Sequence, residues 1–77
     1  MFPSEDTLIQ AWSFDKHFNV CDEYEDAYVF RNTRKRPGDY NPVVLTKDGD
    51  AKPFEFYKPT KFICSHDVKA AIKALND

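Results

Sequence analysis

The chain has 77 residues and a mass of about 9.0 kDa, and its eleven Lys and Arg oppose thirteen Asp and Glu for a formal net charge of −2. No apolar stretch is long enough for a membrane span, the start lacks a signal-peptide pattern, and two cysteines are too few for a disulfide framework. We therefore expect one small domain over residues 1–77, cytoplasmic, with free thiols, no cofactor and no membrane partner.

The N-terminal third predicts a helix followed by a segment whose secondary structure the sequence leaves undecided. Ser4 is a good N-cap and two acids follow it, which predicts a helix over 4–12. Its inward side chains would be Leu8, Ala11 and Trp12. Residues 13–20 alternate in a way that fits a strand as well as a continued helix, so both remain open. The acidic residues 22–26 are interpreted as a connection.

The middle of the chain predicts an antiparallel sheet of about three strands, near 26–32, 42–47 and 53–57. The first two are rich in β-branched and aromatic residues. The Asp48–Gly49 pair favours the positive-φ turn of a hairpin between the second and third. Residues 32–41, with Pro, Gly and two Asn, are typical of an exposed loop.

The end of the chain predicts a helix over about 65–75. Ser65 can cap it, and Val68, Ala71, Ile72 and Leu75 form one apolar stripe. The expected fold class is therefore α+β, with a small antiparallel sheet packed against this C-terminal helix and a short N-terminal helix beside it. The expected core is mainly aromatic: Trp12, Phe14, Phe30, Phe54, Phe56 and Phe62, with Val44, Val68, Ile72 and Leu75.

Charge is segregated along the chain, with a net charge of −6 over residues 1–26 and +4 over 27–47. Acids beside tyrosines suit a basic partner, because carboxylates steer the encounter and tyrosine supplies contact area. The first hypothesis is therefore a non-catalytic protein-binding module, of the kind of a small phage or mobile-element regulator or inhibitor of a larger protein. Its docking residues would be Asp22, Glu23, Tyr24, Glu25, Asp26 and Tyr28.

The alternative hypothesis is nucleic-acid binding by the basic loop 31–36. Its cations neutralise phosphates and a nearby aromatic ring can stack on a base. The residues concerned are Arg31, Arg34, Lys35, Arg36 and Tyr40. A solvated loop that pairs with the protein's own acids explains the same residues, and a homo-oligomer that joins the acidic and basic blocks of two chains is a third class.

The two histidines and two cysteines could supply a metal or catalytic site. His17, Cys21, Cys64 and His66 are a sufficient set for zinc, although their spacing matches no zinc finger. Cys64 and His66 could also form a nucleophile–base pair, but no oxyanion motif accompanies them. We therefore expect neither a bound metal nor an enzyme.

Overall fold

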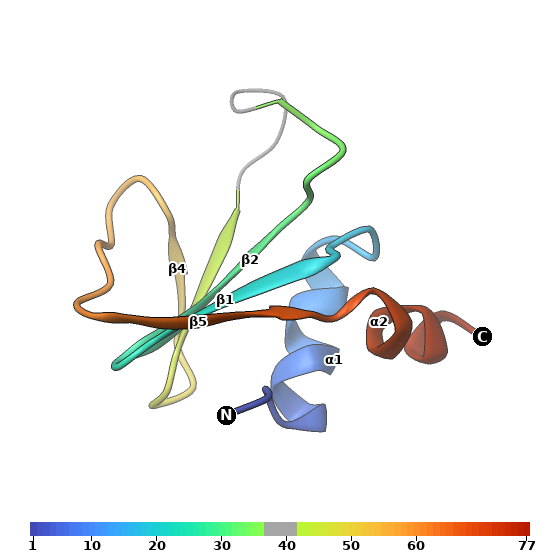
Figure 1. Cartoon of the computed structure of the whole chain (residues 1–77), viewed down its shortest axis with the longest axis horizontal. Coiled ribbons are helices and arrows are strands. Elements are labelled where there is room, and N and C mark those ends of the chain that lie inside the picture. Colours follow the sequence, from blue (N-terminus) through green and yellow to red (C-terminus); the bar gives the residue numbers. More distant parts are fainter. Residues whose placement is uncertain (37–41) are drawn as a thin grey trace.

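The computed structural model describes residues 1–36 and 42–77, which form two helices and a five-stranded antiparallel sheet (Figure 1). The helices are α1 (Glu5–Phe14) and α2 (Lys69–Asn76). The strands are β1 (Val20–Tyr24), β2 (Ala27–Arg31), β3 (Val43–Thr46), β4 (Ala51–Pro53) and β5 (Phe62–Asp67). The strand order is β4-β3-β2-β1-β5, so the last strand returns to pair with the first. The predicted α+β class is confirmed, but the sheet has five strands rather than about three.

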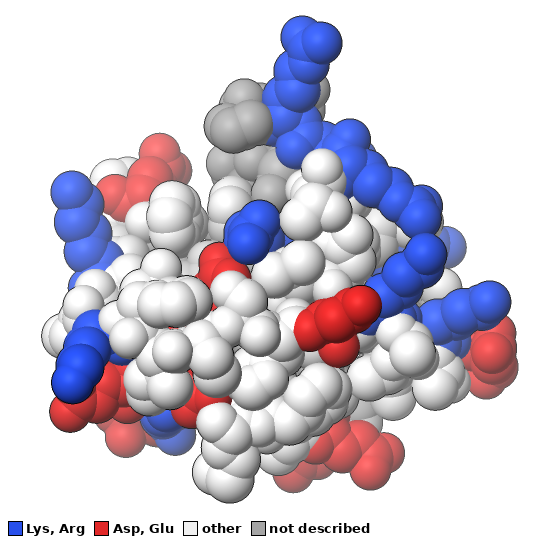
Figure 2. All heavy atoms as spheres, viewed as in Figure 1, with Lys and Arg blue, Asp and Glu red and all other residues white. Residues whose placement is uncertain are grey.

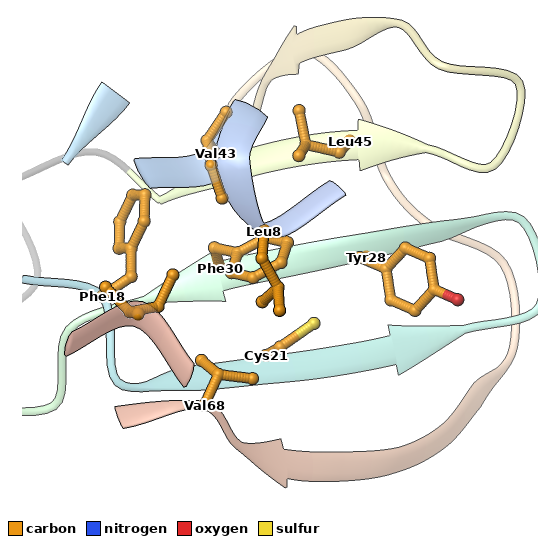
Figure 3. Close-up of a cluster of buried hydrophobic side chains, with 10 residues drawn as sticks. Leu8, Phe18, Cys21, Tyr28, Phe30, Val43, Leu45 and Val68 are labelled. Atoms are coloured by element: carbon orange, nitrogen blue, oxygen red, sulfur yellow. The ribbon is translucent and has the colours of Figure 1, made fainter. Parts of the chain in front are cut away.

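Both helices pack on one face of the sheet and enclose the main core (Figure 3). The sheet contributes alternate residues of three strands to this core, among them Cys21, Phe30 and Leu45, each at most 1% exposed. Its buried members are Leu8, Ala11, Phe18, Cys21, Tyr28, Phe30, Val43, Leu45, Val68 and Ile72. Alternation of side chains along a strand explains why one set of strand residues meets the helices.

The opposite face of the sheet carries a smaller core under the connection between β4 and β5. Ala27, Val29 and Val44 are buried there, and Tyr24 and Tyr57 pack against them. The connection, residues 54–61, runs from one edge strand to the other and is held by Asp26. The Asp26 carboxylate accepts hydrogen bonds from the Tyr57 hydroxyl and from the amide and hydroxyl of Thr60. The second face is therefore closed by a loop rather than by a helix.

The predicted helix cap at Ser4 and the predicted hairpin turn at Gly49 have the expected local structure. The Ser4 hydroxyl accepts a hydrogen bond from the Thr7 amide at 3.2 Å, which caps α1. Gly49 has a φ of 101°, the left-handed region that only glycine enters without strain. The N-terminal helix and the β3–β4 hairpin turn are therefore confirmed.

Several predicted boundaries are wrong. Residues 22–26 are not a connection, because 22–24 belong to β1 and pair with β2 and β5. The return strand of the hairpin is Ala51–Pro53, and residues 54–56 form a turn instead of the predicted strand 53–57. The helix begins at Lys69, not at residue 65, because Ser65 and Asp67 are held in the ladder between β5 and β1. Residues 13–20 are neither one helix nor one strand, since α1 ends at Phe14 and β1 starts at Val20.

The aromatic core is only partly as predicted. Phe30, Val44, Val68 and Ile72 are fully buried, and Trp12 and Leu75 pack at the edge of the main core. Four predicted core residues are exposed: Phe14 at 57%, Phe54 at 45%, Phe56 at 82% and Phe62 at 53%. Three of them lie in or beside the β4–β5 connection, where no helix covers the sheet. Within the described residues, neither helix is long and apolar enough to cross a membrane.

Candidate functional site

The predicted acidic docking surface is largely used by the protein for its own contacts. Asp22 accepts hydrogen bonds from Arg31 Nε at 2.7 Å and from the Ser65 hydroxyl at 2.6 Å. Asp26 holds the β4–β5 connection, as described above. Glu25 is the most exposed acid of this segment. Docking of a basic partner here stays a prediction, and internal partners leave less carboxylate charge for it.

The tyrosines of this segment are also packed. Tyr28 is only 8% exposed and lies in the main core, with the Lys47 ammonium 5.2 Å from its ring centre. Burial raises the pKa of the Tyr28 hydroxyl. Tyr24 is half-buried and meets the ring of Phe62 edge-on at 5.6 Å. Neither ring stands free as an anchor for a partner.

Glu23 is the centre of a buried ionic cluster that the sequence did not indicate. It is 3% exposed, on the helix-covered face of the sheet, and its carboxylate contacts the Met1 amino group. The Lys47 ammonium lies 3.0 Å from Glu23 Oε2, and His66 Nε2 lies 3.0 Å from Oε1. Hydrogen bonds from the Met1 amino group, His66 and Lys47 lower the pKa of Glu23 to about 2, and the same carboxylate raises the pKa of Lys47. Glu23 is therefore ionised and paired rather than offered to solvent.

A basic pocket lies between α2, the turn before β1 and the start of the segment after β2. Its volume is about 420 Å³, and Asp and Glu are absent from the described residues that line it. Five of these residues are cations: Lys16, Arg34, Lys35, Lys69 and Lys73. The others are His17, Asn19, Asn32, Ile72 and Asn76. The nearest acids along the chain, Asp15, Asp67 and Asp77, are absent from the pocket lining.

Within the part of the chain that the structure describes, the five cations of this basic pocket lack the ion-pair partners that the acidic segment has. Among the described residues, the side-chain ion pairs within 4 Å involve Arg31, Lys47, His66 and the amino terminus, not the five pocket cations. Figure 2 shows Lys and Arg atoms along the edge of the molecule that runs from the segment after β2 down toward α2. Like charges held close together repel one another, so this edge carries a positive potential.

The predicted nucleic-acid residues divide between two environments. Arg31 belongs to β2 and pairs with Asp22, whereas Arg34 and Lys35 line the basic pocket and Arg36 is exposed nearby. Tyr40 lies outside the described residues. Sequence reasoning missed Lys16, Lys69 and Lys73, which come from distant segments. The only sequence signal for the last two was their i, i+4 spacing on the polar side of the C-terminal helix.

The two histidines and two cysteines that the sequence offered as a sufficient zinc set, without a bound metal being expected, do not come together as a set of four. His17 lies at the basic pocket and Cys21 is fully buried in the main core, where burial, followed by the nearby carboxylates, raises the pKa of its thiol. Cys64 and His66 do meet, with Sγ and Nε2 3.4 Å apart, and their third neighbour is Glu23. A nucleophilic triad needs the base to contact the thiol and the acid through different ring nitrogens. Here the same Nε2 faces both groups, so the cluster does not form such a relay.

Comparisons of the chain with protein-family models, with curated proteins and with solved structures gave no match.

Proposed function

We propose that the protein binds nucleic acid through the basic pocket lined by Lys16, Arg34, Lys35, Lys69 and Lys73. The observation that carries the proposal is this set of five cations, drawn from three separate segments, around one pocket of about 420 Å³ whose described lining residues include no acid. Phosphates spaced along a nucleic-acid strand would neutralise the mutual repulsion of these side chains. The exposed amide of Asn76 in the same pocket can donate to phosphate, sugar or base edges.

The position of Lys69 supports a ligand role over a purely structural one. Lys69 is the first residue of α2, where the helix dipole disfavours a cation by about 0.3–1 kcal/mol. The cap residue Val68 adds no side-chain hydrogen bond, although the Asp67 carboxylate accepts from the Lys69 amide at 3.0 Å. Asp67 therefore already supplies the acid that suits this helix start, and the Lys69 cation beside it adds no favourable interaction with the helix dipole. A lysine there gains its use from an anion in the basic pocket.

The charge distribution also answers the objection of an acidic pI of 5.6. Asp22 and Glu23 are paired with the cations Arg31 and Lys47, so their charges are partly neutralised in place. The five pocket cations keep their full charge and act on a ligand over about 8–10 Å at physiological salt. The local field at the basic pocket is therefore positive despite the net charge of −2.

Binding is tested with fluorescently labelled single-stranded and duplex oligonucleotides by anisotropy at several salt concentrations. If all five cations contact phosphates of a single strand, log Kd changes with log salt with a slope of about 3.5. The double variant Lys69→Gln/Lys73→Gln should reduce this slope by about 1.4 and weaken binding at least tenfold.

The matched control is Lys58→Gln/Lys61→Gln, which removes the same charge from exposed lysines of the β4–β5 connection. It should retain the slope and nearly all of the affinity. Equal losses in both double variants would show a general charge effect and overturn the basic pocket as the site. If neither the single-stranded nor the duplex oligonucleotide binds at low salt, the proposed function is overturned.

A second candidate, the protein-binding module, is supported by exposed apolar side chains rather than by the acidic segment. Phe54, Phe56, Phe62 and Ile63 are 45–82% exposed, and all four lie in β5 or in the connection before it. Exposed aromatic residues in one region favour contact with another protein. Phe56→Ser combined with Phe62→Ser should abolish capture of a partner from host extract while leaving oligonucleotide binding intact. Sedimentation would separate a different partner from a second copy of this chain.

A further inference from the structure

Strand pairing places three side chains with different donor atoms at one point between β1 and β5. Glu23 of β1 is opposite Cys64 of β5, and His66 lies two residues along β5 on the same face. The three donor atoms are mutually close: Cys64 Sγ lies 3.4 Å from His66 Nε2 and 3.7 Å from Glu23 Oε1, and Nε2 lies 3.0 Å from Oε1. The sheet register, rather than a sequence motif, brings them together.

These separations are close to those of three ligands around one tetrahedral zinc ion. Zinc bonds of about 2.3 Å to sulfur, 2.05 Å to nitrogen and 2.1 Å to oxygen, at tetrahedral angles, place S and N about 3.6 Å apart, S and O about 3.6 Å apart, and N and O about 3.4 Å apart. The observed separations of 3.4, 3.7 and 3.0 Å differ from these by about 0.4 Å or less. Small rotations of the Glu23 and His66 side chains would close the difference.

Two of the three donors are largely shielded from solvent. The Glu23 and His66 side chains are 4% and 16% exposed, so competition from water is reduced. The Glu23 carboxylate already holds two positive groups, the Met1 amino group on Oε1 and the Lys47 ammonium on Oε2. Lys47 can remain on Oε2 and orient the carboxylate, whereas a metal on Oε1 would replace the Met1 amino group.

We propose that Glu23, Cys64 and His66 form a zinc site that joins β1 to β5 and leaves a fourth coordination position for water or a ligand atom. One thiolate and one carboxylate balance the charge of Zn²⁺, and binding releases the thiol proton of Cys64 to solvent. A mixed set of sulfur, nitrogen and oxygen selects zinc or cobalt over magnesium and calcium, which take oxygen ligands. The site lies on β1 and β5, apart from the residues that line the basic pocket.

Cobalt titration of the whole chain tests this site, because cobalt replaces zinc and reports its ligands by absorption. We expect one equivalent to produce a thiolate-to-cobalt charge-transfer band together with the intense visible bands of tetrahedral cobalt. Zinc should remove both signals and raise the melting temperature, and a chelator should reverse the rise. Cys64→Ser should abolish the charge-transfer band, and His66→Gln should weaken cobalt binding about 100-fold or more.

The histidine and the cysteine that lie outside the proposed site, His17 and Cys21, serve as controls. His17→Ala and Cys21→Ala should retain the spectrum and the affinity. A charge-transfer band that survives in Cys64→Ser, or is lost only in Cys21→Ala, would overturn the assignment of ligands. No cobalt spectrum in the folded wild-type chain would overturn the site without any variant. As a measurement independent of variants, zinc should protect Cys64 from alkylation, and unchanged labelling would also refute the proposal.

Discussion

Ile72 is the buried residue of α2, and its truncation gives the most direct test of how this helix packs on the sheet. Its side chain is 1% exposed and belongs to the main core beneath both helices. Ile72→Ala removes three carbon atoms, and at about 0.8 kcal/mol for each the lost burial is about 2.4 kcal/mol. A residual cavity raises the expected cost to about 3–4 kcal/mol.

Ile9→Ala is the matched control for this change. Ile9 is also helical, so the gain in helix propensity on going to alanine is the same, but its side chain is 45% exposed. It should cost about 1 kcal/mol, because roughly half of the same area is buried and no closed cavity forms. A domain of this size has a total stability of about 4–11 kcal/mol, so Ile72→Ala would remove a large share of it.

Urea unfolding followed by tryptophan fluorescence measures both variants, since Trp12 packs against the same core. With a urea dependence of about 1 kcal/mol per molar, the midpoint should fall by about 3 M for Ile72→Ala and by about 1 M for Ile9→Ala. Equal shifts for the two variants would refute the packing of α2 described above. A large fall in the slope for Ile72→Ala alone would show that α2 detaches before the sheet unfolds.

Two further predictions concern titratable groups. Hydrogen bonds, first from the Thr60 amide and then from the Tyr57 hydroxyl, lower the pKa of Asp26 from 3.8 to about 2. The ionised carboxylate therefore stabilises the fold fully above about pH 4. This stabilisation is lost as the pH falls through about 2. Asp26→Asn should therefore lower the melting temperature at pH 7 and flatten its decline between pH 4 and 2, whereas Glu25→Gln should leave both unchanged. In thiol labelling of the metal-free chain, Cys64 should react in the native state, whereas Cys21 should react only on unfolding. The reason is that Cys21 is buried, and burial raises the pKa of its thiol. Two fast-reacting thiols in the native state would contradict the burial of Cys21.

The elements that sequence predicted well are those whose signals are local. The Ser4 cap, the strand Ala27–Arg31 and the Asp48–Gly49 turn each depend on neighbours within a few residues, and all three were found. The apolar stripe of α2 was also correct, with Val68 and Ile72 buried. Its start was misplaced because the cap signal at Ser65 lost to strand pairing with β1, a contact about 40 residues distant in sequence.

The errors in the core and the site have a common origin in long-range arrangement. Phe54 and Phe56 alternate with polar residues as on a strand, but β4 ends at Pro53 and leaves them in an exposed turn. The acidic run was interpreted as surface because nothing local shows that Glu23 would meet Lys47 and His66. The distribution of charge along the sequence shows where the acidic and basic segments are. It does not show which acids and bases pair with each other in the folded protein.

The return of β5 to β1 has a consequence for how the protein is made. Until the last strand leaves the ribosome, β1 has only one neighbour, and its other edge presents unpaired backbone groups. Closing the long loop between the two strands carries an entropic cost that no earlier contact of that edge offsets. The sheet therefore cannot be completed before β5 has been synthesised. Products truncated before residue 62 should be prone to aggregation and sensitive to proteases.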